Sequence, residues 1–369
     1  MKIGIIAFPY EGGKSGLWNH IKNIVEKITE IDQENEYYIF THYDFKIRRK
    51  NVEQLLFKSN LINHPIINIL WHRVYLPYAV KKLKIDLLHL PAGNRRLIFS
   101  KPCKVIATIH DIVPKYGILR AFYTKTILPL AIKNLDKVIC VSKSTEKDVI
   151  EKWNVDKSIT EILPNGIDLD LYNVLNKEIS RGFVSEKYNI SGKFIFYVSR
   201  LEHPGKNQVG LIKAFSKLKE EYGIPYRLVF AGSNWNGAKY IYRAAKKSRF
   251  SEDIIFLGFV PPEDLPYFYN TCDLFVFPSL YEGFGIPILE AFAAGAPVVC
   301  SNTSSMPEVL GDCGLVFNPT DPDDIAKKIH MMLNDSALRE QCIRKGRERA
   351  KLFDWKNIAR KTITIYESV

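Results

Sequence analysis

The sequence predicts an α/β protein with two Rossmann-like domains, each a parallel sheet flanked by helices. Short apolar runs alternate with amphipathic helical patterns along the 369 residues, as in folds whose parallel strands are joined by helices. The alternation pauses once, around residues 163–191, where Pro164, Asn165 and Gly166 signal a turn before a polar stretch. Each half then has about 170 residues, which is a common domain size.

The first half is expected to hold five strands, with an amphipathic helix after the first. The helical segment carries Leu17, Ile21, Ile24, Val25 and Ile28 on one face. In such sheets, ligands bind beyond the carboxyl ends of the strands. The expected strands are residues 2–8, 37–41, 85–90, 104–109 and 137–141.

The second half repeats the pattern with six expected strands, and helices fit between most of them. Two doubly wound domains face to face would form a cleft, which is a favoured place for a ligand. The expected strands are residues 194–198, 227–231, 254–257, 274–277, 298–301 and 315–317.

The composition is that of an ordinary globular protein, with 46% hydrophobic and 25% charged residues. No apolar run reaches the roughly 18 residues that a membrane span needs. The short apolar N-terminal run lacks a signal-peptide cleavage site, so a cytoplasmic protein is expected. The six cysteines form no C-x-x-C pair and are expected to be reduced core thiols.

The net charge of +12 raises the question of a polyanionic partner. No helix-turn-helix, zinc-finger or RNA-binding signature accompanies the charge, so nucleic acid is not expected to bind. Residues 60–84 combine basic side chains with Trp71 and several tyrosines, and residues 46–50 add a basic run. Such segments can dock on an anionic membrane surface. An ordinary core helix with a solvated basic face is the alternative.

A glycine-rich turn at residues 10–16 follows the first strand. Its Gly13-Lys14-Ser15 is similar to the end of a Walker A motif, but Phe8 occupies the place of that motif's first glycine. We therefore reject a P-loop nucleotidase. Glycines between a strand and a helix let the backbone approach a phosphate at the helix N-terminus. From these residues alone, a phosphate site and a tight turn without a ligand both stay open.

The most informative segment contains Glu282 and Glu290. It follows a strand, and its loop carries Gly283 and Gly285 before Pro287, which suits the first turn of a helix. The glycines expose backbone N–H groups where the partial positive charge of a helix N-terminus collects. The carboxylates suit sugar or ribose hydroxyls, and the amides suit phosphate oxygens or hydroxyls. Two surface charges on a bare turn are the alternative.

The wording EGFGIPILEA resembles the E-x7-E signature of retaining glycosyltransferases, in the form typical of glycosyltransferase family four. The resemblance covers essentially the whole chain. It implies the GT-B fold, with an acceptor domain at residues 1–165, a nucleotide-sugar domain at 166–350, and a C-terminal helix at 351–369 that packs back on the first domain. The other matching motifs are His110-Asp111, Pro164 to Asp168, Ser199-Arg200, Lys206-Asn207, Gly258 to Val260, Ser305 to Glu308, and Phe353 to Trp355.

The resemblance also assigns roles to single residues. Arg200 and Lys206 are expected to clamp the donor pyrophosphate through charge-assisted hydrogen bonds. Glu290 is expected on the ribose hydroxyls. Glu282, on the transferred sugar, and His110, near the reacting centre, are the expected catalytic residues. Further donor contacts are expected from Gly13, Val260, Phe284, Gly285 and Ile286.

The implied reaction is transfer with retention of anomeric configuration by front-face attack. The leaving phosphate takes the acceptor proton while Arg200 and Lys206 stabilise its charge. Residues 203–205 set these two cations slightly further apart than in the family. No nucleophile and acid pair of glycosidase type is visible. The D-x-D sequences at 168–170 and 321–323 are interpreted as a turn and a helix cap, so neither a metal ion nor another cofactor is expected.

The wording around residues 109–114 and 304–308 resembles relatives that use GDP-mannose. We therefore expect mannose transfer to a saccharide or lipid-linked saccharide in cell-surface glycan synthesis, such as lipopolysaccharide. The protein is expected to be cytoplasmic, or peripheral at the inner face of the cell membrane. A UDP-hexose stays open as the donor. The rivals are a same-fold epimerase or phosphorylase, and a non-catalytic nucleotide- or polyanion-binding relative.

Overall fold

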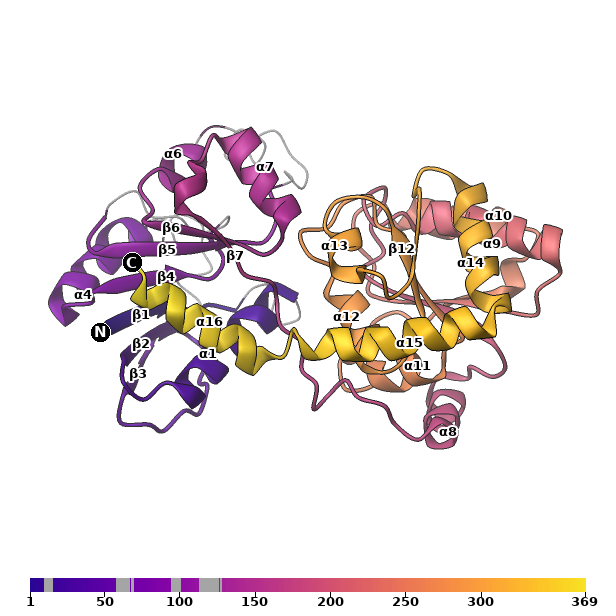
Figure 1. The fold of residues 1–369 in the computed structure, drawn as a ribbon, viewed down its shortest axis with the longest axis horizontal. Coiled ribbons are helices and arrows are strands. Elements are labelled where there is room, and N and C mark those ends of the chain that lie inside the picture. Colours follow the sequence, from indigo (N-terminus) through magenta and orange to yellow (C-terminus); the bar gives the residue numbers. More distant parts are fainter. Residues whose placement is uncertain (10–15, 58–66, 68–69, 94–100, 113–125, 127) are drawn as a thin grey trace. The chain divides into compact units, whose positions relative to one another are not determined.

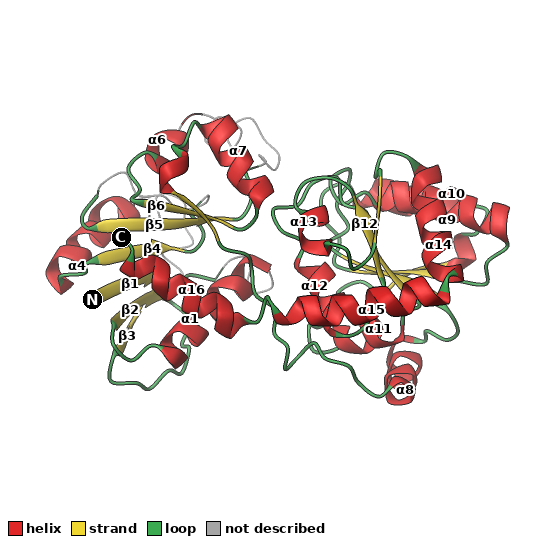
Figure 2. Cartoon of the chain, viewed as in Figure 1, coloured by secondary structure: helices red, strands yellow, loops and turns green. Residues whose placement is uncertain are grey.

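A computed structural model describes residues 1–9, 16–57, 67, 70–93, 101–112, 126 and 128–369. The chain forms two compact units. The first comprises Met1–Gly166 with Trp355–Val369, and the second comprises Ile167–Asp354. Each unit is a parallel sheet with helices packed on it (Figure 1, Figure 2). The predicted α/β class with two Rossmann-like domains is confirmed.

In the described part of the first unit, the strands follow the order β3-β2-β1-β4-β5-β6-β7. The five predicted strands are present, with ends that differ by at most two residues. The sequence analysis missed the two edge strands, β3 and β7, because edge strands keep polar side chains such as Glu53 and Glu161. The strands are β1 (Lys2–Ile6), β2 (Glu36–Thr41), β3 (Val52–Leu56), β4 (Leu87–Leu90), β5 (Lys104–Ile109), β6 (Lys137–Cys140) and β7 (Thr160–Ile162).

Helix α1 (Gly16–Ile31) buries its predicted apolar face, including Ile24 and Ile28, in the core of the first unit. Helix α16 (Trp355–Glu367) lies beside α1 and adds Tyr366 to the same core (Figure 1). The predicted return of the C-terminal helix to the first domain is confirmed. The other described helices of this unit are η2 (Trp71–Tyr75), α4 (Leu76–Leu83), α6 (Leu128–Ile132), α7 (Lys143–Trp153) and η4 (Lys157–Ile159).

The second unit has the strand order β10-β9-β8-β11-β12-β13 and contains all six predicted strands. Its strands are β8 (Phe194–Val198), β9 (Arg227–Ala231), β10 (Ile254–Phe256), β11 (Leu274–Phe277), β12 (Val298–Ser301) and β13 (Leu315–Phe317). Its helices are α8 (Lys177–Tyr188), α9 (Gln208–Tyr222), α10 (Ala238–Lys247), η5 (Ser251–Asp253), α11 (Leu265–Thr271), α12 (Ile286–Ala293), α13 (Met306–Leu310), α14 (Pro322–Asn334) and α15 (Ser336–Lys351).

The strand order of the second sheet reverses between β8 and β11. Strands β9 and β10 continue on one side, and β12 and β13 continue on the other. At such a switch point, the loops after the two central strands run in opposite directions and leave room for a ligand. The first sheet reverses in the same way between β1 and β4.

The six cysteines are free thiols, as predicted. Five are buried, whereas Cys103 is partly exposed, so the core placement is wrong for that residue. Burial raises the pKa of the Cys272 and Cys300 thiols, which keeps them protonated and unreactive. Among the described helices, none is both long and apolar enough to cross a bilayer.

Candidate functional site

Two loops meet beyond the carboxyl ends of β8 and β11, at the switch point of the second sheet. The loop after β8 carries Arg200 and Lys206, and the loop after β11 carries Glu282. The Lys206 Nζ forms an ion pair with Glu282 Oε1, and each side chain is 16% exposed. In this mostly desolvated place, each charge compensates the other. The resemblance assigned the two residues to different parts of a donor, and the structure brings them into contact.

The loop that carries Lys206 is anchored by neighbouring elements. The Tyr197 hydroxyl donates to the Lys206 carbonyl at 2.9 Å. The Leu280 N–H, on the loop after β11, donates to the Gly205 carbonyl at 2.9 Å. Residue Asn207 donates from Nδ2 to the Pro319 carbonyl at 2.7 Å. The additional residues of this loop therefore leave Lys206 in contact with the carboxylate.

Arg200 lies beside a tryptophan that the sequence analysis did not single out. The guanidinium carbon is 4.7 Å from the centroid of the Trp235 ring, which makes a cation–π contact. The loop of Trp235 follows β9, and its N–H donates to the Leu201 carbonyl at 3.1 Å. Gly232 permits this close approach, because a Cβ there would lie 1.8 Å from the Ser199 carbonyl oxygen. The tryptophan had no signal in the sequence beyond its place in a loop.

The loop that begins at Glu282 is held by two serines that follow β12. The Ser304 hydroxyl donates to the Glu282 carbonyl. Ser305 Oγ lies 3.0 Å from the same carbonyl and 2.8 Å from that of Phe284. The loop ends at Gly285 with φ +105°, a conformation that favours glycine, and α12 follows directly. Since no described side chain caps α12, its first amides stay available to an anion or a hydroxyl.

Glu290 lies about one turn into α12, in a different environment. The Tyr269 hydroxyl donates to its Oε2 at 2.7 Å, and Tyr172 also hydrogen-bonds to this carboxyl group. Among the described residues, no lysine, arginine or histidine forms an ion pair with Glu290. Burial raises the pKa of Glu290 to about 7, while the hydrogen bonds from the tyrosines act in the opposite direction. The sequence analysis missed both tyrosines, which read as ordinary core residues.

The other predicted donor contacts are spread along the chain. The Phe284 side chain is buried and its ring centroid lies 5.9 Å from that of Phe353, so this residue offers only its backbone. Ile286 is the first residue of α12. Val260 is buried on the segment after β10. The predicted phosphate contact Gly13 lies outside the described residues.

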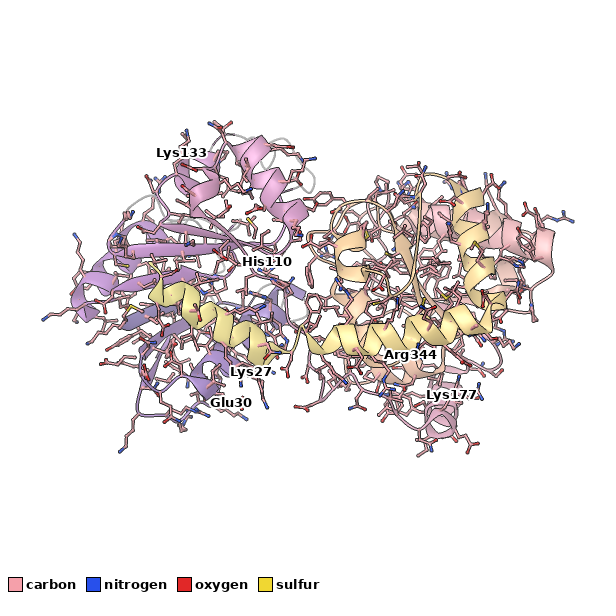
Figure 3. The ribbon with its side chains drawn as sticks, in the orientation of Figure 1. Lys27, Glu30, His110, Lys133, Lys177 and Arg344 are labelled. Atoms are coloured by element: carbon pink, nitrogen blue, oxygen red, sulfur yellow. The ribbon has the colours of Figure 1, made fainter. Side chains whose placement is uncertain are left out.

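His110 follows β5 in the first unit and is partly buried (Figure 3). Its Nε2 lies 2.9 Å from the Pro91 carbonyl oxygen, which assigns a proton to that nitrogen because a carbonyl only accepts. The buried ring of His20, from α1, packs edge-on with centroids 4.5 Å apart. Burial, aided by the neighbouring His110, lowers the His20 pKa well below its usual value. A neutral imidazole that the sequence analysis missed therefore packs against His110.

The two D-x-D sequences have structural roles, as predicted. Asp168 Oδ1 accepts the N–H groups of Asp170 and Leu171 at 3.0 and 3.1 Å. Asp321 caps α14 and accepts the N–H of Asp323 at 2.9 Å. Within the described residues, no group of three or more histidine, cysteine, aspartate or glutamate side chains is placed to hold a metal ion.

Both halves of the chain match known families. Residues 14–171 match Glycosyltransferase Family 4, and residues 181–349 match Glycosyl transferases group 1. The O-antigen chain mannosyltransferase B of Escherichia coli is 34% identical over 272 residues, which cover 72% of this chain and 70% of that protein. The serotype-specific mannosyltransferase WbdA of Escherichia coli is 32% identical over 270 residues. That match covers 70% of this chain but only 32% of the relative.

A solved structure shares the architecture over the full length. Anabaena Alr3699/HepE, crystallised with UDP and glucose, superposes with a TM-score of 0.79 at 20% identity, with all of both chains covered. At that identity the likeness shows the fold, and that fold is GT-B. Because the two families match the two halves in chain order, and a relative above 30% identity spans most of the chain, the protein belongs to family 4 of the glycosyltransferases.

Proposed function

We propose that this glycosyltransferase moves mannose from GDP-mannose to a saccharide or lipid-linked saccharide, with retention of configuration, in cell-surface glycan synthesis. The names of the relatives support mannose and an O-antigen type of product. The observation that carries the catalytic part is the Lys206–Glu282 ion pair just before the uncapped N-terminus of α12. A hexose phosphate needs a cation for its phosphate and an acceptor for its hydroxyls, and this pair supplies both.

In the proposed reaction, the acceptor oxygen attacks the anomeric carbon on the face from which the phosphate leaves. The bond between that carbon and the phosphate oxygen breaks, and the departing oxygen takes the acceptor's proton. Arg200 and Lys206 stabilise the charge on the phosphate. The phosphate competes with Glu282 for Lys206, and Glu282 accepts a hydrogen bond from a hydroxyl of the transferred sugar. His110 lines the reacting centre.

The remaining donor contacts follow from the same proposal. Glu290 accepts hydrogen bonds from the ribose hydroxyls, and Val260 lies near the base. The backbone amides at Gly285 and Ile286 bind phosphate or sugar oxygens through the positive end of α12. Gly13 contributes a phosphate contact from the other domain. No metal ion takes part, and we expect activity to survive treatment with EDTA; a loss that only added Mg²⁺ or Mn²⁺ restores would contradict this.

A UDP-hexose is the second candidate donor, because the HepE structure holds UDP and glucose. Thermal shift with GDP-mannose, UDP-glucose and UDP-galactose separates the candidates, since the tighter donor raises the melting temperature more. We expect the largest rise with GDP-mannose. A larger rise with a UDP sugar would move the assignment to that donor.

Retention can be tested on donor hydrolysis, which needs no acceptor. Proton NMR of the sugar released from α-linked GDP-mannose is expected to show α-mannose first. Early accumulation of β-mannose would contradict retention. Nucleotide binding without turnover of any donor in the panel would instead favour a non-catalytic relative.

We also propose that the first domain contacts an anionic membrane surface. The side chains of Leu70, Val74 and Tyr78 are exposed at 55%, 64% and 60%, at helical spacing in and just before η2 and α4. Lys81 and Lys82 follow in the last turn of α4. Apolar and basic groups together suit such a surface. Co-sedimentation with anionic vesicles at low salt should be lost on changing both lysines to glutamate. No binding by the wild type would sink the idea.

A further inference from the structure

We infer that Tyr172 and Tyr269 are positioning residues that orient the Glu290 carboxylate for the ribose of the nucleotide. The inference rests on the proposed function, because that function places a ribose at Glu290. Tyr269 comes from α11 and Tyr172 from the segment between Ile167 and α8, so two separate elements hold one carboxyl group. The two rings also contact each other, with centroids 6.1 Å apart.

The geometry leaves acceptor capacity for a ligand. A carboxylate offers about four lone-pair sites, and the two phenols occupy two of them. Tyr269 is fully buried and Tyr172 nearly so, whereas Glu290 keeps part of its surface exposed. The tyrosines therefore hold the carboxylate from the protein side while its remaining lone pairs can face a ligand.

The kind of holding also suits a ribose. Lys206 neutralises Glu282, but only neutral hydroxyls bond to Glu290 among the described residues. A neutral donor fixes direction without offering a competing charge, so the carboxylate stays a strong acceptor for a neutral diol. A ribose presents two adjacent hydroxyls, and only a carboxylate of fixed orientation can accept from both.

The experiment measures dissociation constants by calorimetry for GDP and 2′-deoxy-GDP, and for UDP and 2′-deoxy-UDP. The proteins are the wild type, Tyr172→Phe, Tyr269→Phe and Glu290→Gln. Tyr188→Phe is the matched control, since its hydroxyl donates to the Asp264 carboxylate at 2.5 Å outside the site. The ratio of deoxyribose to ribose dissociation constants is the readout. Loosened packing changes both constants alike, whereas loss of orientation changes their ratio.

We expect the wild type to prefer the ribonucleotide by about tenfold, as for a hydrogen bond to a charged group. Each site variant should lower this ratio to about threefold or less, and the control should keep it. An unchanged ratio in both tyrosine variants, or an equal weakening of both ligands, would overturn the inference alone. Should Tyr269→Phe fail to fold, Tyr172→Phe decides. Binding of neither GDP nor UDP by the wild type would overturn the proposed function, and the inference with it.

Discussion

The two carboxylates of the E-x7-E segment lie in contrasting surroundings. Glu282 is on a loop, and its charge is compensated by Lys206. Glu290 is on a helix, held by two tyrosine hydroxyls, with a pKa raised to about 7 by burial. The first arrangement keeps opposite charges at hand for a phosphate and a sugar. The second provides a directed acceptor for neutral hydroxyls. A single motif thus supplies two kinds of recognition, and each kind can be tested by itself.

Removing the cation at the Glu282 end should have the largest effect. We expect Lys206→Met to lower kcat/KM for donor turnover about 10³-fold, because charge on the leaving phosphate loses a stabilising partner. Initial rates by coupled nucleotide release measure the change. Lys219→Met is the matched control, since Lys219 pairs with Asp253 at 2.6 Å away from the site. A loss below about tenfold for Lys206→Met would remove this lysine from the clamp.

The two glutamines should affect stability unequally. Glu282→Gln leaves the mostly buried Lys206 without its partner and should lower the free energy of unfolding by about 3 kcal/mol. Glu290→Gln keeps an oxygen that accepts from Tyr269 and removes a charge that no described cation neutralises. At pH 8 it should be at least as stable as the wild type. Urea unfolding compares them, and equal losses in both variants would show that the surroundings are not different.

The pH dependence of stability should single out Glu290. Its pKa is about 7 in the folded chain against 4.5 for the ordinary group. Between these values the folded state binds the proton more tightly, so the free energy of unfolding falls as pH rises from about 4.5 to 7. We expect the wild type to lose about 2 kcal/mol relative to Glu290→Gln across this range. Parallel curves for the two proteins would place this pKa at its ordinary value.

Much of this contrast lies beyond what sequence patterns encode. The strands and their order along the chain follow from buried apolar runs, and the glycines, Pro287 and both glutamates mark the donor loop. The partners that distinguish Glu282 from Glu290 come from elsewhere in the chain. Lys206 lies 76 residues before Glu282, and Tyr269 lies 21 residues before Glu290. Nothing local in the sequence records such pairings, and a buried tyrosine reads as core until its hydroxyl partner is known.

The smallest expected effect concerns Trp235, at the charged end of the site. Removing its ring by Trp235→Leu takes away the cation–π contact to Arg200 and should weaken GDP binding by about 1 kcal/mol, or roughly fivefold. Trp235→Phe should retain most of the affinity. Calorimetry measures both variants. If Arg200→Ala and Trp235→Leu weaken binding additively in the double variant, the ring does not act through the arginine.

Initial-rate kinetics of donor hydrolysis for Glu282→Gln and Glu290→Gln tests the division of roles most directly. Glu282→Gln should lower kcat with little change in KM, because this carboxylate acts on the transferred sugar. Glu290→Gln should raise KM with little change in kcat, because this carboxylate binds the nucleotide in ground state and transition state alike. The reverse pattern, or the same pattern in both variants, would contradict two distinct roles for the two ends of the segment.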